Sequence, residues 1–178
     1  MFGLIKDKIA EIVVQRQLKY KQLGSHIFTD FFAKAFTFFV AMPEDDHDFN
    51  HSLVVLNFLA ENKKSVIILT RDYKVSLLPA KYRAKTIEYN FKDISKLYLP
   101  SKRLIDKLTE LQFNASIDLN RKENLFYSLS ANLVQAPVRI GFTKPDSDKF
   151  YNLQVVNGED NPEISYKNFL NCLQMFQG

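Results

Sequence analysis

The chain has 178 residues, of which 46% are hydrophobic, so it has room for one globular domain with a substantial core and too little chain for two full domains. Its 24 Lys and Arg exceed its 20 Asp and Glu by only four, without a long basic run, so a dedicated nucleic-acid binder is disfavoured. The single cysteine, Cys172, excludes an internal disulfide and a cysteine-based zinc cluster, and charges near the start leave no apolar signal core; a cytoplasmic location is expected.

Residues 1–34 are predicted to be a helical extension. Apolar side chains recur near helical spacing from residue 2 to about residue 23, Gly24 suits the end of that helix, and a second helical stretch follows at 26–34. The apolar positions are Phe2, Ile5, Ile9, Ile12 or Val13, and Tyr20, while basic residues elsewhere are Lys6, Lys8, Arg16, Lys19 and Lys21.

A basic amphipathic helix of this kind has three uses. It can pack on its own domain, pair with another chain or a second copy, or lie on an anionic membrane surface. Packing is favoured over membrane contact, because an amphipathic helix of a globular protein usually buries its apolar face against the protein. Peripheral contact with the inner face of the membrane stays an alternative.

Residues 35–178 alternate between strands and helices. Strands are predicted at 35–41, 65–70, 86–91, 115–119, 138–142 and 151–156, and helices at 48–61, 73–78, 101–111, 123–134 and 162–176. This alternation implies right-handed crossovers and a mainly parallel sheet with helices on both faces. The predicted fold is therefore α/β, a single Rossmann-like domain that follows the N-terminal helix.

Ligands of open parallel sheets bind beyond the carboxyl ends of the strands. Polar residues fall at these positions in four segments, 42–48, 70–74, 120–124 and 143–148. The candidate site is expected where these segments meet.

Two motifs carry a resemblance to a known family. Residues 113–120 read Phe-Asn-Ala-Ser-Ile-Asp-Leu-Asn, and residues 139–142, after a helix rich in small residues, read Arg-Ile-Gly-Phe. With the first strand and its loop, the segment 36–176 resembles the N-terminal domain of glycosyltransferase family 9, the ADP-heptose:lipopolysaccharide heptosyltransferases. The family's Gly-Asp loop and Pro-x-Leu-Arg-x-Leu helix then fall on Asp48, Leu56 and Leu59.

The resemblance implies one half of a GT-B glycosyltransferase of lipopolysaccharide synthesis, with Asp48 as the general base that takes the acceptor's proton. The sequence departs from the family at His47, which replaces glycine, and at Asn114 and Asn120, which replace aspartate and histidine. A family enzyme also has a second domain that holds the sugar nucleotide, and this chain is expected to lack it.

We therefore expect a non-catalytic or degenerate module that binds another protein chain or a second copy. The alternative is the acceptor-side subunit of a split glycosyltransferase, with a sugar acceptor as its ligand and Asp48 as its base.

Each candidate residue also has a structural interpretation. Asp48 would suit the N-cap of the predicted helix 48–61, a role worth about 1 kcal/mol. Asp118 could contact ligand, but a buried strand aspartate more often accepts hydrogen bonds from loop amides, and that role is favoured. The remaining candidate substrate contacts are Glu44, His47, Asn120, Arg121, Lys122 and Lys144, of which the basic ones suit a phosphate or a carboxylate sugar acid.

Metal and nucleotide binding are not expected. The loop 44–48 with His51 contains ligand-type side chains, but their spacing matches no dedicated metal site. The chain has neither a Gly-x-Gly-x-x-Gly run nor a Gly-Lys-Ser/Thr phosphate loop. No metal or cofactor is therefore assigned.

Overall fold

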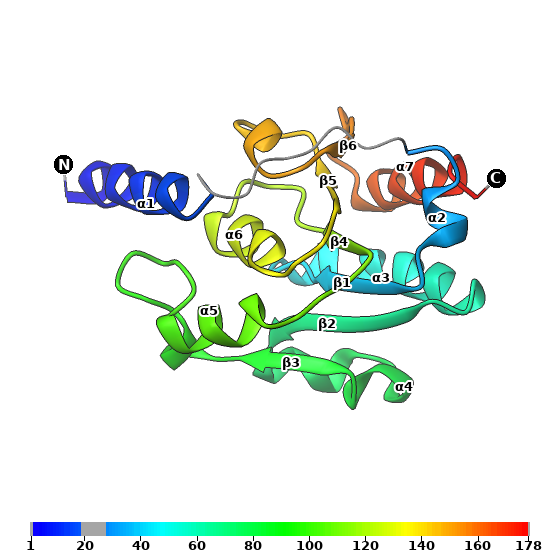
Figure 1. Cartoon of the computed structure of the whole chain (residues 1–178), viewed down its shortest axis with the longest axis horizontal. Coiled ribbons are helices and arrows are strands. Elements are labelled where there is room, and N and C mark those ends of the chain that lie inside the picture. Colours follow the sequence, from blue (N-terminus) through cyan, green and yellow to red (C-terminus); the bar gives the residue numbers. More distant parts are fainter. Residues whose placement is uncertain (1, 19–27, 178) are drawn as a thin grey trace.

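A computed structural model describes residues 2–18 and 28–177 (Figure 1). Its strands form one six-stranded sheet in the order β3-β2-β1-β4-β5-β6, and every neighbouring pair is parallel. The strands are β1 (Thr37–Ala41), β2 (Ser65–Arg71), β3 (Thr86–Tyr89), β4 (Ala115–Asp118), β5 (Val138–Phe142) and β6 (Leu153–Val155). The predicted α/β, Rossmann-like fold is confirmed, and the sheet is wholly parallel.

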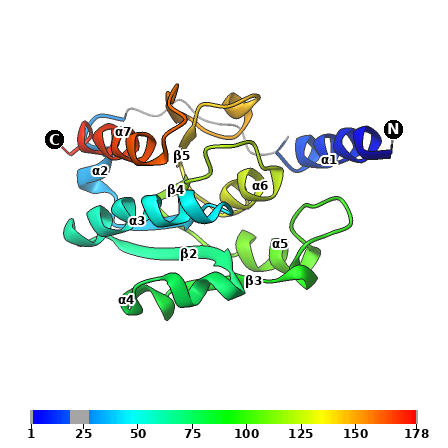
Figure 2. The same ribbon diagram turned by 180° about the vertical axis from the view of Figure 1, so that it is seen from behind.

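Helices cover both faces of the sheet (Figures 1 and 2). One core contains side chains of α3 and α7, and the other contains side chains of α1, α5 and α6. The helices are α1 (Phe2–Leu18), α2 (Phe31–Lys34), α3 (Asp46–Glu61), α4 (Ala80–Arg83), α5 (Lys102–Thr109), α6 (Leu125–Leu133) and α7 (Pro162–Gln174), with 3-10 turns η1 (Asp72–Leu77), η2 (Phe91–Asp93) and η3 (Ser147–Lys149).

β1 lies at the centre of this arrangement. Phe38 and Val40 enter the core under α3 and α7, whereas Phe39 and Ala41 enter the opposite core, because successive side chains of a strand point to opposite faces. This explains why the strand is apolar almost throughout. At its amino end, the Asn114 side-chain oxygen accepts hydrogen bonds from the backbone N–H groups of Phe36 and Thr37, both at 2.9 Å.

The strand order determines where on the sheet the candidate site lies. The chain starts in the middle of the sheet at β1, winds outward to β3, and then returns to the other side of β1 as β4. The loops after β1 and β4 therefore leave the sheet in opposite directions at the position where parallel sheets bind ligands.

Several predicted boundaries need correction. The helix expected at 48–61 begins at Asp46, and its N-cap is Asp45, whose carboxylate accepts a hydrogen bond from the Asp48 backbone N–H at 3.0 Å. The N-cap role expected for Asp48 is therefore wrong. The helix expected at 73–78 is the 3-10 turn η1, and the strand expected at 151–156 is reduced to β6, a three-residue edge strand.

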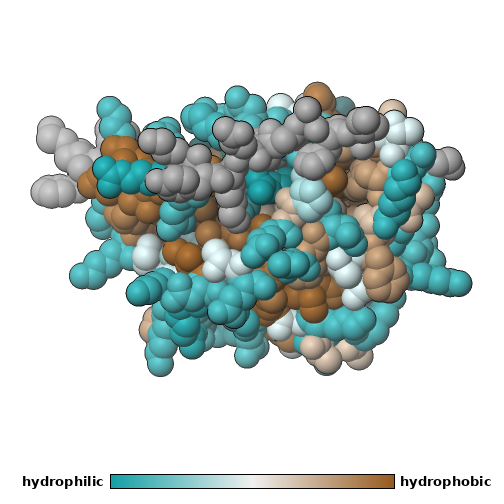
Figure 3. Space-filling model, in the orientation of Figure 1, coloured by the Kyte–Doolittle hydropathy of each residue, from teal (hydrophilic) through white to brown (hydrophobic). Residues whose placement is uncertain are grey.

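α1 packs on α6 through a stripe that matches the predicted one only at Val13, which is half-buried against this core. Ala10 and Val14 are buried, whereas Ile9 and Ile12 are 44% and 51% exposed. Small side chains at the contact let the two helices approach closely, which rotates the larger isoleucines outward. Figure 3 shows hydrophobic surface among hydrophilic side chains where α1 lies. The predicted turn at Gly24 and the positions Lys19, Tyr20 and Lys21 lie outside the described residues.

None of the helices in the described ranges is long and apolar enough to cross a membrane.

The packing of α1 is tested by two truncations. Val14→Ala should lower the free energy of unfolding by about 1–2 kcal/mol, because it removes buried methyl groups. Ile12→Ala, on the exposed side of the same helix, should change it by less than about 0.5 kcal/mol. Urea unfolding measures both, and an equal effect of the two changes would contradict this packing.

Candidate functional site

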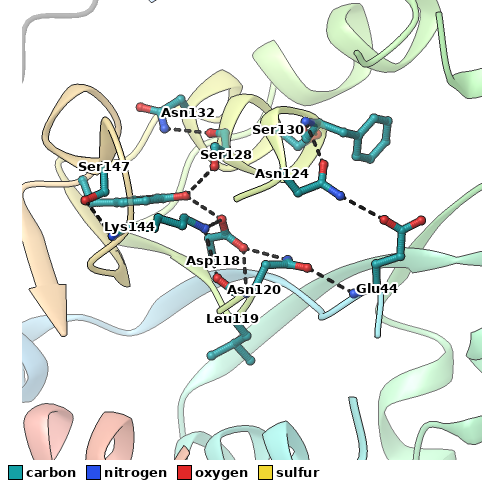
Figure 4. A network of polar contacts seen from close by, with 12 residues as sticks. Glu44, Asp118, Leu119, Asn120, Asn124, Ser128, Ser130, Asn132, Lys144 and Ser147 are labelled. Atoms are coloured by element: carbon teal, nitrogen blue, oxygen red, sulfur yellow. Dashed lines mark hydrogen bonds and ion pairs between the residues drawn. The ribbon is translucent and has the colours of Figure 1, made fainter. Parts of the chain in front are cut away.

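The four polar segments predicted at the carboxyl edge of the sheet are joined by side-chain hydrogen bonds. Arg71, the last residue of β2, bonds Glu44 in the loop after β1 at 2.5 Å. The Asn120 side-chain oxygen accepts a hydrogen bond from the Glu44 backbone N–H at 3.1 Å, and Lys144, after β5, reaches Asp118 at 3.0 Å. Figure 4 shows Glu44, Asp118, Asn120 and Lys144 converging from separate segments of the chain.

Asp118 is a fully buried carboxylate whose two oxygens both accept hydrogen bonds. Oδ1 accepts from the Asn120 backbone N–H at 3.0 Å and from its side-chain amide at 2.8 Å. Oδ2 accepts from the Lys144 ammonium at 3.0 Å (Figure 4) and from the Tyr151 hydroxyl at 2.5 Å. Both side chains are already engaged inside the protein. The role of Asp118 and Lys144 is therefore to hold the loops in place.

Tyr151 completes this buried cluster. Burial and the adjacent Asp118 carboxylate raise the pKa of Tyr151 well above its ordinary value, so the phenol stays protonated and donates to Asp118. Its hydroxyl also contacts the Ser128 hydroxyl at 2.9 Å, and the Lys144 ammonium lies 5.3 Å from the centre of its ring. A Cβ atom at Gly141 would come within 2.7 Å of the ring. The glycine of the Arg-Ile-Gly-Phe motif is thus explained by this close approach.

Glu44 is fixed at the outer end of the network. Its carboxylate accepts hydrogen bonds from Arg71 at 2.5 Å and from the Asn124 side chain at 2.9 Å. Its backbone carbonyl accepts a hydrogen bond from Lys74, a buried lysine that also pairs with Asp46 at 2.7 Å. The loop after β1 is therefore held by charged partners on its sheet-facing side.

Asp48, the predicted general base, is bound by Arg121. A single oxygen of Asp48 accepts from Nε of Arg121 at 2.9 Å and from Nη2 at 2.7 Å. The third nitrogen, Nη1, donates to the backbone carbonyls of Glu159 at 3.2 Å and Asp160 at 2.9 Å. Burial alone lowers the pKa of Arg121, but the hydrogen bond and the charge of Asp48 outweigh it, so the pKa is raised.

A hollow of about 320 Å³ lies beside this pair. Its lining includes five of the predicted site residues, which are Glu44, Asp48, Asn120, Arg121 and Lys122. Asp118 and Lys144 lie beneath it in the buried cluster. His47 is exposed on α3, where its ring meets that of His51 edge to face with the centres 4.9 Å apart. Within the described ranges, no three His, Cys, Asp or Glu side chains are grouped to hold a metal ion.

A second hollow, of about 270 Å³, adjoins the first and shares Glu44 and Asn124 with it. Its other lining residues are mostly aromatic and come from β2, β3, α6 and the loop 90–100; they are Arg71, Tyr89, Ile94, Tyr98, Phe126 and Tyr127. The hydroxyls of Tyr89 and Tyr127 contact each other, and burial raises the pKa of Tyr89 to about 12. Tyr98 stands at the edge, 72% exposed.

This second hollow was not predicted from the sequence. One usable signal was the loop 90–100, which follows the end of a predicted strand and contains Tyr98. The contribution of Tyr127 had no comparable signal, because it comes from inside a helix predicted to be packed.

The wholly parallel sheet with helices on both faces is a Rossmann-like half of a GT-B glycosyltransferase-like fold. A search of solved structures aligns it with the E. coli heptosyltransferase WaaC with ADP, at a TM-score of 0.56 and 15% sequence identity. The alignment covers 77% of this chain and 47% of that chain, so this chain spans about half the length of the enzyme. At this identity the likeness shows the fold alone. No protein-family model and no curated protein matches the sequence.

The buried cluster is tested at Gly141. Gly141→Ala should destabilise the protein by about 1–3 kcal/mol, because the new methyl group would overlap the Tyr151 ring. Gly158→Ala serves as the control, since a Cβ there meets no atom within 4 Å, and should cost less than about 0.5 kcal/mol. The measurement is chemical denaturation followed by circular dichroism. Equal losses for the two variants would mean that Tyr151 is not packed against Gly141.

Proposed function

We propose that this domain is a degenerate heptosyltransferase-like module that binds a glycan at the carboxyl edge of its sheet without activating it. The proposal rests on the fold and on the ion pair between Asp48 and Arg121. The side chains of the two residues are only 4% and 13% exposed. Both hydrogen bonds from Arg121 fall on one oxygen of Asp48, so this carboxylate is already engaged by a partner inside the protein. Asp48 is therefore better suited to holding the loops than to general base catalysis.

The two adjoining hollows support the binding role. Together they offer carboxylate, amide and guanidinium groups beside aromatic rings. Sugars are recognised by this combination, because their hydroxyls exchange hydrogen bonds with polar groups while their C–H faces pack on aromatic rings. Exposed Tyr98 is the ring most accessible to such a ligand. The fold relates the domain to enzymes that handle sugars, and the hollows make a glycan the ligand class that fits.

The competing function is the acceptor-side subunit of a split glycosyltransferase, which requires Arg121 to release Asp48 when the acceptor binds. One observation favours it: Asp48 borders the first hollow. The two functions differ in what Asp48 does, so one substitution separates them.

Tyr98→Ala tests glycan binding. Titration with a heptose and with a carboxylate sugar acid, followed by NMR of the backbone amides, should show roughly fivefold weaker binding because the ring is lost. Tyr73→Ala, which removes another exposed tyrosine on η1, should leave the affinity unchanged. The absence of any amide shift around the hollows with the unaltered protein would refute glycan binding by these sugars.

Asp48→Asn tests the absence of catalysis. The variant should lose about 3 kcal/mol of stability, because the Arg121 charge loses its partner, and should still bind the glycan. Asp106→Asn, an exposed change on α5, should leave both the stability and the glycan binding unchanged. Sugar transfer assayed in an extract of the native cell supplemented with each variant should be equal. Loss of transfer with folded Asp48→Asn alone would establish the split enzyme instead.

A further inference from the structure

A basic hollow lies at the amino edge of the sheet, opposite the candidate site. It has a volume of about 380 Å³ and is lined by the lysines Lys63, Lys64, Lys81 and Lys85, together with Phe36 and Tyr82 among others. The lysines come from the turn between α3 and β2 and from the segment 80–85, which contains α4. In Figure 1, α4 lies at the opposite end of β2 and β3 from α1.

The charge of this hollow is not balanced by acidic side chains. Its lining contains no Asp or Glu. Among the described residues, the ion pairs join Arg71, Lys74, Arg103, Arg121, Lys144 and Lys149 to carboxylates, and none includes a lysine of the hollow. The chain as a whole carries a net charge of +4, so four like charges in one hollow are a marked local concentration. A bound anion would relieve their mutual repulsion.

Two of the lysines have a structural role as well. Lys63 and Lys64 follow the last turn of α3, where positive charge complements the helix dipole. The Lys64 ammonium donates to the backbone carbonyl of Phe32 at 2.6 Å, and burial lowers the pKa of this lysine. Helix capping therefore accounts for part of the cluster.

That explanation does not extend to Lys81 and Lys85. Both are exposed, and within the described part of the chain no hydrogen bond or ion pair engages either ammonium group. The Lys81 ammonium lies 4.9 Å from the centre of the Tyr82 ring, a contact that leaves its N–H groups available to a ligand. These two side chains line the hollow together with Lys63 and Lys64 and come from a separate segment of the chain.

We propose that this hollow binds a ligand with clustered phosphate groups, at a site separate from the glycan site. Lysine ammonium groups bind phosphate as point charges, and four lysines in one hollow suit more than one phosphate. Phe36, 60% exposed at the rim, offers an apolar surface for the rest of the ligand. The volume is at the lower end of the range typical of small-molecule sites. The phosphates belong either to a free polyphosphorylated compound or to a lipid headgroup.

Inorganic tripolyphosphate is the soluble probe. Calorimetric titration of the full chain at fixed ionic strength should show binding, and the double variant K81Q/K85Q should bind about tenfold more weakly because it removes the two unengaged charges. The control K96Q/K167Q removes the same charge from exposed positions elsewhere, and its affinity should change less than twofold. Thermal melting of each variant checks that it is folded, and the single changes K81Q and K85Q replace the double variant if it is not.

Vesicles of phosphatidylcholine with and without phosphatidic acid identify the source of the phosphates. Sedimentation with the acidic vesicles that is lost in K81Q/K85Q and kept in K96Q/K167Q supports a lipid headgroup, whereas a response to tripolyphosphate alone supports a free ligand. If both double variants bound equally weakly, the affinity would depend only on the overall charge of the protein. That result would overturn the proposal. Failure to respond to either probe would overturn it as well, and neither result would affect glycan binding.

Discussion

The buried carboxylate of Asp118 is the constraint on which the carboxyl edge of this sheet depends. Because its side chain is removed from solvent, the surrounding chain has to supply every hydrogen bond that the charge requires. The donors are Asn120, Lys144 and Tyr151, which come from three separate segments. One charge therefore ties the loop after β4 to the loop after β5 and to the chain that enters β6. Gly141 is part of the same constraint, because the Tyr151 ring fills the space that a side chain there would need.

This network limits which neighbouring charged groups are available to a ligand. Lys144 and Arg121 had the chemistry of phosphate or carboxylate ligands, yet each is directed to an internal carboxylate at 3.0 Å and 2.7 Å respectively. Catalytic sites usually keep at least one titratable group poised for proton transfer and aimed at the substrate. Here the described charged groups Asp48, Arg121, Asp118 and Lys144 are paired with one another, while Tyr98 at the edge of the second hollow is exposed. This arrangement is the basis for proposing recognition without reaction.

Much of the fold could be predicted from the sequence, because local patterns determined it. The apolar run of β1 indicated a strand covered on both faces, and the alternation of elements indicated a parallel sheet. The N-cap of α3 was misassigned because Asp45 and Asp48 are chemically equivalent, and only the backbone geometry selects between them. The stripe of α1 was misassigned because packing against α6 favours the small Ala10 over the large Ile9. The segments that contain Asp48 and Arg121 were predicted to meet, but the pairing of these two side chains, 73 positions apart, depends on geometry that the pattern does not contain.

The guanidinium of Arg121 has a consequence beyond the loop it belongs to. The same side chain that holds Asp48 at the start of α3 also holds the backbone carbonyls of Glu159 and Asp160, just before α7. One residue of the loop after β4 therefore adds a polar bridge between the amino ends of α3 and α7, which also share a hydrophobic core. An anion that drew this guanidinium away would remove the contacts to both helix starts at once.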